Sequence, residues 1–273
     1  MTSKGDLILQ KLNPNETTFL GIMSGCVEIM LLQPILYCKN AAQQNLKLTL
    51  DPRVLYRGLS VSIINMGVAT GLQFSFTAKI TKAMTKGEVR KLTGAELLMS
   101  SFSGGFLSGL VGGPLELVLI QQQRFGGSLA KVPIELIKSY GLPVLTRGMI
   151  LTSFREGLFC AGYLGMTPLL SRYFNEKHNI KESSAKIYAS IIAGLIAAPL
   201  SHPFDTLKTG MQGDVQRTKY GSLVETYNAM LKEGGVKRLF NGLFWRTLRM
   251  ILGIYVINES KLTLAPMFFG SNL

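Results

Sequence analysis

The stretch PLSHPFDTLKTGMQ, residues 199–212, follows directly on IYASIIAGLIAA, residues 187–198, which is almost wholly apolar. It places Asp205 three residues before Lys208, at the end of a segment suited to lipid. Charges at membrane depth are costly unless they are paired or reach water. The stretch therefore predicts ion pairing inside the protein, with partners supplied by other segments of the chain.

The bulk composition favours a membrane protein. The chain has 273 residues, 47% of them hydrophobic and 16% charged, with a mean hydropathy of +0.26, whereas soluble domains carry about 25% charged residues. The net charge of +13 favours anionic partners. Nucleic acid is the poorer choice of anion, because the sequence lacks the basic stripe with interleaved aromatic residues that is typical of nucleic-acid binding. Three cysteines without CxxC spacing and two distant histidines favour neither a disulfide framework nor a metal site, so we expect no cofactor.

Long apolar segments predict the fold class. Each is interrupted by Gly, Ser, Gln or a charge, which suits a bundle around a polar interior. We expect an all-α membrane fold of six transmembrane helices with both termini on one side. We expect no cleavable signal, because the first twenty residues contain Asp6 and Glu16 and lack an apolar run. The predicted spans are 17–43, 58–84, 95–123, 149–175, 184–212 and 241–268.

Self-similarity divides the chain into three tandem units. With Pro34, Pro114 and Pro203 as origins, a glutamine lies nine residues after each proline and a glycine nine residues before it. The prolines are 80 and 89 residues apart, so each unit holds two spans. The predicted repeats of a single domain, 1–273, are 17–90, 91–180 and 181–273.

Two short motifs recur in register with this repeat. PFDTLK, residues 203–208, has the pattern Pro-x-Asp-x-x-Lys, and YRG, residues 56–58, joins an aromatic, a basic residue and glycine before the second span. The threefold repeat with these motifs resembles the mitochondrial carrier family over nearly the whole chain. The other copies are incomplete, since TRG at 146–148 lacks the aromatic residue and FNG at 240–242 lacks the basic one.

The resemblance implies a pseudo-threefold bundle with short amphipathic helices on the matrix side, for which 131–140 and 222–233 are the candidates. It implies a transporter rather than an enzyme, a monomer in the mitochondrial inner membrane, and cardiolipin as a bound lipid. An excess of Lys and Arg in the loops after the odd spans fits the positive-inside tendency.

The resemblance also implies a gate. Offsets +2, +5 and +9 from each proline share one helix face, because a helix turns by about 100° per residue. The acid of one odd helix is expected to pair with the base of the next, which joins Glu116 to Lys208 and Asp205 to Lys39. The third pair is replaced by two leucines, so no buried charge is orphaned. We expect the two pairs to break and reform during transport, with a static brace as the alternative. The accompanying residues are the leucines Leu36 and Leu119, a glutamine brace of Gln43, Gln123 and Gln212, and the prolines Pro34, Pro114 and Pro203, expected to kink their helices.

The resemblance also implies a substrate site, because carriers of this type place substrate contacts about seven residues after the glycines that open the even spans, near the bilayer midplane. The positions are Asn65, Arg155 and Arg249, and arginine offers a planar fork that matches a carboxylate. Glu156 and Glu28 are candidate acids of the same site, and Glu28 could bind a substrate amine, carry a proton or pair with an arginine. Structural pairing of the arginines with local acids is the alternative. We expect a small anionic metabolite, most simply a carboxylate that is an oxo acid, a dicarboxylate or an amino acid.

The family's second gate, an acid and a base near the far ends of the even helices, is missing from FTAKITK, YLGMTPLL and INESKLTL, residues 76–82, 163–170 and 257–264. Its absence supports a competing hypothesis, a membrane scaffold or interaction protein that does not transport. A membrane enzyme is a third possibility, but no nucleophile–base or metal constellation supports it.

Overall fold

The computed structural model describes residues 14–269 except 87, 89 and 91, and these residues form helices joined by short loops. The long elements are α2 (Pro14–Gln43), α4 (Leu59–Met84), α5 (Gly94–Phe125), α9 (Glu182–Gly213) and α11 (Leu243–Phe269). The shorter ones are α3 (Pro52–Leu55), α6 (Lys131–Tyr140), η1 (Leu142–Thr146), α7 (Met149–Cys160), η2 (Ala161–Met166), α8 (Thr167–His178) and α10 (Leu223–Arg238). The described chain is all-α, as the sequence predicts.

Five of the six predicted spans are single helices, and the fourth is not. It runs through α7, then the π-helical turn η2, then α8. Gly162 within this turn packs so tightly that an added Cβ would lie 2.5 Å from the Cβ of Ala197 on α9. Pro34, Pro114 and Pro203 lie inside helices that continue past them, and the expected kinks stay a prediction.

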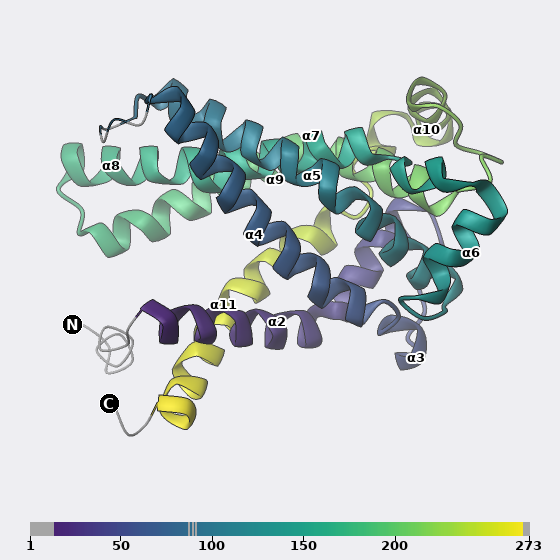
Figure 1. Ribbon diagram of the computed structural model, residues 1–273, viewed down its shortest axis with the longest axis horizontal. Helices are drawn as coiled ribbons and strands as arrows, with labels where there is room; N and C mark the ends of the chain where they lie inside the picture. Colours follow the sequence, from purple (N-terminus) through teal and green to yellow (C-terminus); the bar gives the residue numbers. More distant parts are fainter. Residues whose placement is uncertain (1–13, 87, 89, 91, 270–273) are drawn as a thin grey trace.

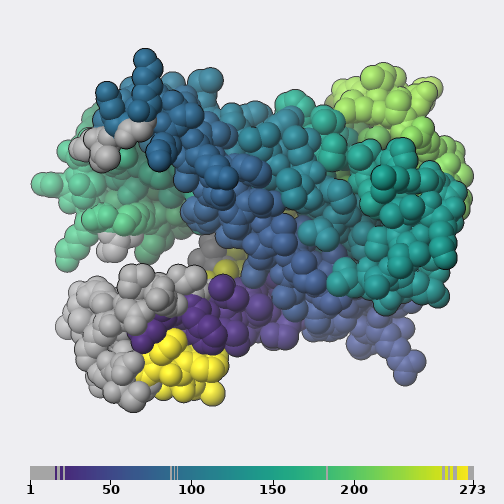
Figure 2. Space-filling model, in the orientation of Figure 1, coloured from purple at the N-terminus to yellow at the C-terminus, as the bar shows by residue number. Residues whose placement is uncertain are grey.

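The helices run between two ends of the molecule. Figure 1 shows α3, α6 and α10 gathered at the right-hand end, with the start of α2 and the end of α11 at the left-hand end. The two ends of the described chain therefore lie on the same side, as six spans require. Figure 2 shows the surface hollowed on the left, between the α8–α9 pair above and α2 with α11 below.

The packing of α9 is that of a helix solvated by lipid. Small residues at a spacing of four are buried against neighbouring helices, and large apolar residues at the same spacing are exposed. Small residues let membrane helices approach closely where hydrophobicity supplies no drive between them. The buried set is Ala185, Ala189, Ala193 and Ala197, and the exposed set is Ile187, Ile191 and Leu195. By length and composition, four stretches of the described residues could cross a membrane: Ile22–Gln43, Pro52–Met84, Gly94–Phe125 and Ser184–Gly213.

A glycine in the left-handed region precedes each of three even-numbered spans. Gly58, Gly148 and Gly242 have φ of +78°, +73° and +88°, a conformation that side chains with a Cβ rarely adopt. Each abuts the end of an odd helix, because an added Cβ would lie 2.6 Å from Leu119, 3.1 Å from Gln212 and 2.9 Å from the Lys39 carbonyl, respectively. The three junctions close a ring in which each even helix begins against the odd helix of the next predicted repeat.

The contact between α5 and α7 gives a first prediction. A Cβ at Gly109 would lie 2.5 Å from the Cα of Ser153, and backbone cannot move aside as a side chain can. We expect Gly109→Ala to destabilise the protein by about 1–3 kcal/mol through overpacking. Gly67 on α4 is the matched control, because no atom lies within 4 Å of the Cβ position and alanine favours helix. Thermal melts in detergent that respond equally to both substitutions would contradict this close approach.

Candidate functional site

Two buried ion pairs join the odd helices near their C-terminal ends. Lys39 Nζ on α2 lies 2.7 Å from Asp205 Oδ2 on α9, and Lys208 Nζ on α9 lies 2.9 Å from Glu116 Oε2 on α5. These are the two contacts that the sequence predicts. Lys208 Nζ also lies 3.3 Å from Asp205 Oδ1, which joins the pairs into one cluster. The function of the cluster as a gate stays a prediction.

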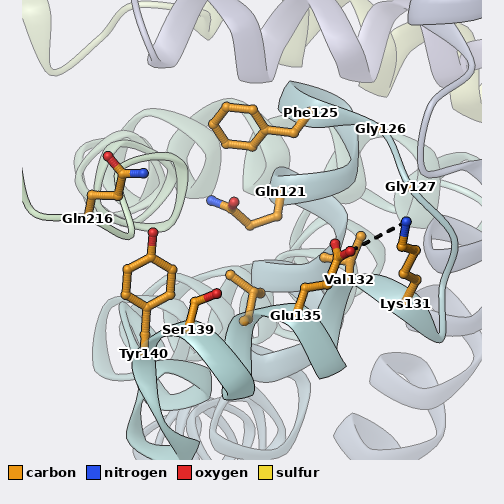
Figure 3. A pocket seen from close by; sticks show the side chains of 11 residues that line it. Gln121, Phe125, Gly126, Gly127, Lys131, Val132, Glu135, Ser139, Tyr140 and Gln216 are labelled. Carbon is orange, nitrogen blue, oxygen red and sulfur yellow. Dashed lines mark ion pairs between the residues drawn. The ribbon is translucent and has the colours of Figure 1, made fainter.

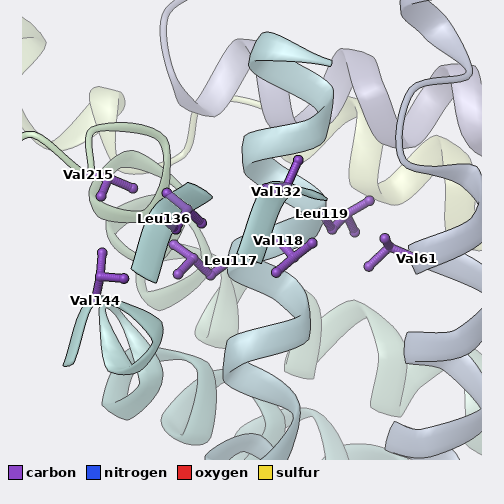
Figure 4. Close-up of a cluster of buried hydrophobic side chains, with 8 residues drawn as sticks. All are labelled: Val61, Leu117, Val118, Leu119, Val132, Leu136, Val144 and Val215. Carbon is purple, nitrogen blue, oxygen red and sulfur yellow. The ribbon is translucent and has the colours of Figure 1, made fainter. Parts of the chain in front are cut away.

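The third position of the ring is apolar. Leu119 belongs to a buried cluster of aliphatic side chains, and Leu36 of α2 packs against that cluster. Figure 4 shows the cluster, with Leu119 facing Val61 of α4. Its other members are Leu117, Val118, Val132, Leu136, Val144 and Val215. Hydrophobic packing therefore occupies the place of the missing third ion pair.

The leucine positions give a second prediction. Leu36→Asp and Leu119→Lys each bury a lone charge, whereas the double variant restores a pair. We expect the free energy of unfolding of the double variant to exceed, by about 0.5–3 kcal/mol, the value obtained by adding the two single effects. A double-mutant cycle of melting temperatures measures this coupling, and simple additivity would show that the two side chains do not oppose each other.

Of the predicted glutamine brace, only Gln43 supports an ion pair. Its Nε2 donates to Asp205 Oδ2 at 2.9 Å. The prediction is wrong for the other two. Gln212 Nε2 donates to the backbone carbonyls of Gly113 and Arg147 at 3.4 and 3.3 Å, and Gln123 Oε1 accepts from Asn40 Nδ2 at 2.5 Å. Gln123 belongs to the part of the ring where Leu36 and Leu119 replace the third ion pair, so it has no charged pair to support.

Arg155, predicted as a substrate residue, reaches into the ion-pair cluster. Its Nη2 lies 2.5 Å from Glu116 Oε1 and also donates to Glu156, while its Nε lies 3.7 Å from Asp205 Oδ1. Glu156 accepts a second hydrogen bond, at 2.9 Å, from Gln73 Nε2 of α4. Arg155 is therefore paired with neighbouring acids, as the alternative hypothesis expected.

Arg249 and Glu28 form a separate pair between α11 and α2. Arg249 Nη2 lies 3.1 Å from Glu28 Oε1, and Glu28 is buried whereas Arg249 is partly exposed. Of the three options for Glu28, pairing with an arginine is the one observed. Asn65, the third predicted substrate residue, has a buried Oδ1 without a hydrogen-bond partner and lies beside Gly112 of α5.

Sequence reasoning missed Arg246. It lies one helical turn before Arg249, is buried, donates to Ser201 Oγ at 2.7 Å and lies 3.8 Å from Asp205 Oδ2. With Arg246 the connected cluster holds four cations and three acids, which leaves one positive charge in excess. The cations are Lys39, Arg155, Lys208 and Arg246, and the acids are Glu116, Glu156 and Asp205.

Each of the three arginines keeps a buried nitrogen without a hydrogen-bond partner. These atoms are Arg155 Nε, Arg246 Nη1 and Arg249 Nε. Buried donors are normally satisfied, so an unsatisfied one calls for an explanation. An added carboxylate would supply acceptors and also offset the excess charge of the cluster.

A pocket of about 430 Å³ lies elsewhere, between the end of α5, α6 and the loop after α9. Figure 3 shows that Gln121, Ser139, Tyr140 and Gln216 border it and that its lysine, Lys131, is paired with a glutamate. No arginine lines this pocket, so it is distinct from the arginine site. The described side chains of 76–82 and 163–170 form no ion pair, and those of Asn258 and Lys261 lie outside the described residues.

Apolar outer faces around a charged, ion-paired interior indicate a multi-pass membrane protein, and such an interior is typical of transporters. A sequence profile described as "Mitochondrial carrier protein" matches residues 181–257. The chain is 23% identical to the "Mitochondrial glycine transporter" of Aspergillus niger, over 94% of this chain and 93% of that protein. It is 24% identical to "Mitochondrial tricarboxylate transporter 1" of Mycosarcoma maydis, over 91% and 93% of the two chains. It is also 24% identical to the "Mitochondrial 2-oxodicarboxylate carrier" of Pongo abelii, over 84% and 86%.

The match of residues 181–257 to the family profile and the similarity of most of the chain to curated mitochondrial carriers support membership of the mitochondrial carrier family. The chain is accordingly a multi-pass transporter of the mitochondrial inner membrane. The resemblance to this family implies that the end with α3, α6 and α10 faces the matrix, and this orientation stays a prediction.

Proposed function

We propose that this carrier moves a small carboxylate across the inner membrane by alternating access. The observation that carries the proposal is the set of three arginines in the polar interior, each with a buried nitrogen that has no hydrogen-bond partner among the described residues. The names of the relatives agree, because glycine, a tricarboxylate and a 2-oxodicarboxylate all bear carboxylates.

In this account the ion-pair cluster is the matrix gate. With Lys39–Asp205 and Lys208–Glu116 formed, the odd helices are held together at their matrix ends. The hollow in Figure 2 lies toward the opposite end, where a substrate would enter. A substrate carboxylate that binds Arg155 competes with Glu116 and Asp205 for this cation, and this competition couples substrate binding to the ion-pair cluster of the gate.

An anionic lipid headgroup is proposed at the start of α4. Gly58 caps this helix without any side-chain hydrogen bond, so backbone N–H groups of its first turn are free of side-chain caps. Helix N-termini of this kind bind phosphate groups. Cardiolipin is the lipid that the family resemblance implies.

A thermal-shift screen of the purified protein tests the proposed function. A ligand that binds only the native state raises the apparent melting temperature. We expect stabilisation by one or more members of a panel of oxo acids, dicarboxylates and amino acids, and none by nucleotides. A protein that melts cooperatively and responds to no carboxylate would instead favour the scaffold hypothesis.

A further inference from the structure

The Arg249–Glu28 pair stands apart from the charge cluster and is its own small site. It bridges α11 and α2, with side-chain exposures of 31% for Arg249 and 9% for Glu28. Gly253, one turn further along α11, leaves room for the carboxylate, because an added Cβ would lie 3.2 Å from Glu28 Oε1. A buried acid is thus paired with a partly exposed arginine.

The two charges select for a ligand that carries both signs. A ligand with only a carboxylate, on binding Arg249, competes with Glu28 and leaves that buried acid without its cation. An unpaired buried charge is strongly unfavourable. A ligand that also carries an ammonium group replaces one ion pair with two, so that neither protein charge is orphaned.

Arg155, the other candidate for binding the substrate carboxylate, is less suited to exchanging one ion pair for two. Arg155 already contacts the carboxylates of Glu116 and Glu156 and lies near Asp205. Those acids are also tied to Lys208 or to Gln73. Among the described residues Arg249 has one acidic partner and its Nε has no hydrogen-bond partner, so its pair is the place where a ligand can insert between cation and acid.

We infer that the substrate is an α-amino acid, whose carboxylate binds Arg249 and whose ammonium binds Glu28. The inference rests on the proposed function and names its substrate class. In an α-amino acid the two charged groups are attached to one carbon, which suits a guanidinium and a carboxylate that are themselves in contact. Glu28→Gln would remove the negative charge that pairs with the ammonium.

Pairs of substrates that differ only at the α-carbon test the inference. Uptake into liposomes would be compared for glycine and glyoxylate, alanine and pyruvate, and glutamate and 2-oxoglutarate. For at least one pair we expect the wild-type carrier to take up the amino acid at least tenfold faster than the matching oxo acid. In Glu28→Gln this ratio should fall to near one, whereas Glu259→Gln, an exposed acid on α11, should keep it.

The ratio is measured within each variant, so differences in yield or reconstitution cancel. Wild-type uptake of the oxo acids at rates equal to or above those of the amino acids would overturn the inference and leave the proposed function standing. A Glu28→Gln carrier that keeps the full preference would overturn it as well. Uptake of no compound in either class, and of no dicarboxylate or tricarboxylate, would contradict the proposed function itself.

Discussion

Asp205→Asn should abolish transport and lower the melting temperature by on the order of 10 °C, the largest effect that the structure predicts for one substitution. Asp205 is fully buried and lies 2.7 Å from Lys39, 3.3 Å from Lys208 and 2.9 Å from Gln43. Removing one partner of a buried ion pair typically costs about 3–5 kcal/mol, since it leaves the other charge uncompensated. Here the cluster would have two cations in excess rather than one.

Glu135→Gln is the control for this variant. Glu135 pairs with Lys131 at 3.4 Å, but both side chains are largely exposed, and exposed pairs contribute little to stability. Melting curves and initial uptake rates of both variants, reconstituted side by side, provide the measurement. An Asp205→Asn carrier that melts and transports as the wild type does would show that the cluster neither braces nor gates the matrix end.

Arg155→Gln should reduce uptake by 100-fold or more and also destabilise the protein. Losing one member of a buried charged pair costs about 2–5 kcal/mol, and each 1.4 kcal/mol is a factor of ten. The structure separates the two effects, because the loss of Arg155 leaves Glu156 with only the amide of Gln73. We therefore expect Arg155→Gln with Glu156→Gln to recover much of the stability without recovering transport.

The double variant distinguishes a transport function from a bracing function. If Arg155 serves only as a structural partner of its neighbouring acids, restoring stability should restore uptake in proportion. Melting temperatures and uptake rates of the wild type, both single variants and the double variant complete the comparison. Recovery of transport together with stability would remove Arg155 from the proposed mechanism.

The helices could be predicted because they follow from the apolar segments and the repeat. Fixed offsets from the prolines place Glu116, Asp205 and Lys208 on one helix face, and the resemblance to the carrier family supplied the pairing of each acid with the base of the next odd helix. Positions seven residues after the glycines also led to Arg155 and Arg249. These are features that one helix face and one repeat determine.

The remaining features depend on neighbours that no local pattern specifies. Arg246 has no charged counterpart in the repeat, since Ser62 and Thr152 occupy the matching positions four residues after Gly58 and Gly148. Gln212 bonds to backbone carbonyls that α5 and the start of α7 bring to it, and an amide accepts any such partner. The π-helical turn at 161–166 likewise lies where Gly162 packs against α9.

The most direct test of the central claim is the initial rate of carboxylate uptake into liposomes by the wild type and by Arg249→Gln. Among the described residues Arg249 pairs with Glu28 and not with the ion-pair cluster, so its loss should leave that cluster intact. The melting temperature should fall, because buried Glu28 loses its cation, and Arg249→Gln with Glu28→Gln should recover it without recovering uptake. We predict saturable uptake of at least one carboxylate by the wild type and its near-complete loss in the variant. Equal uptake by both proteins would contradict the site, and the absence of carboxylate uptake by a well-folded wild type would contradict the transport function.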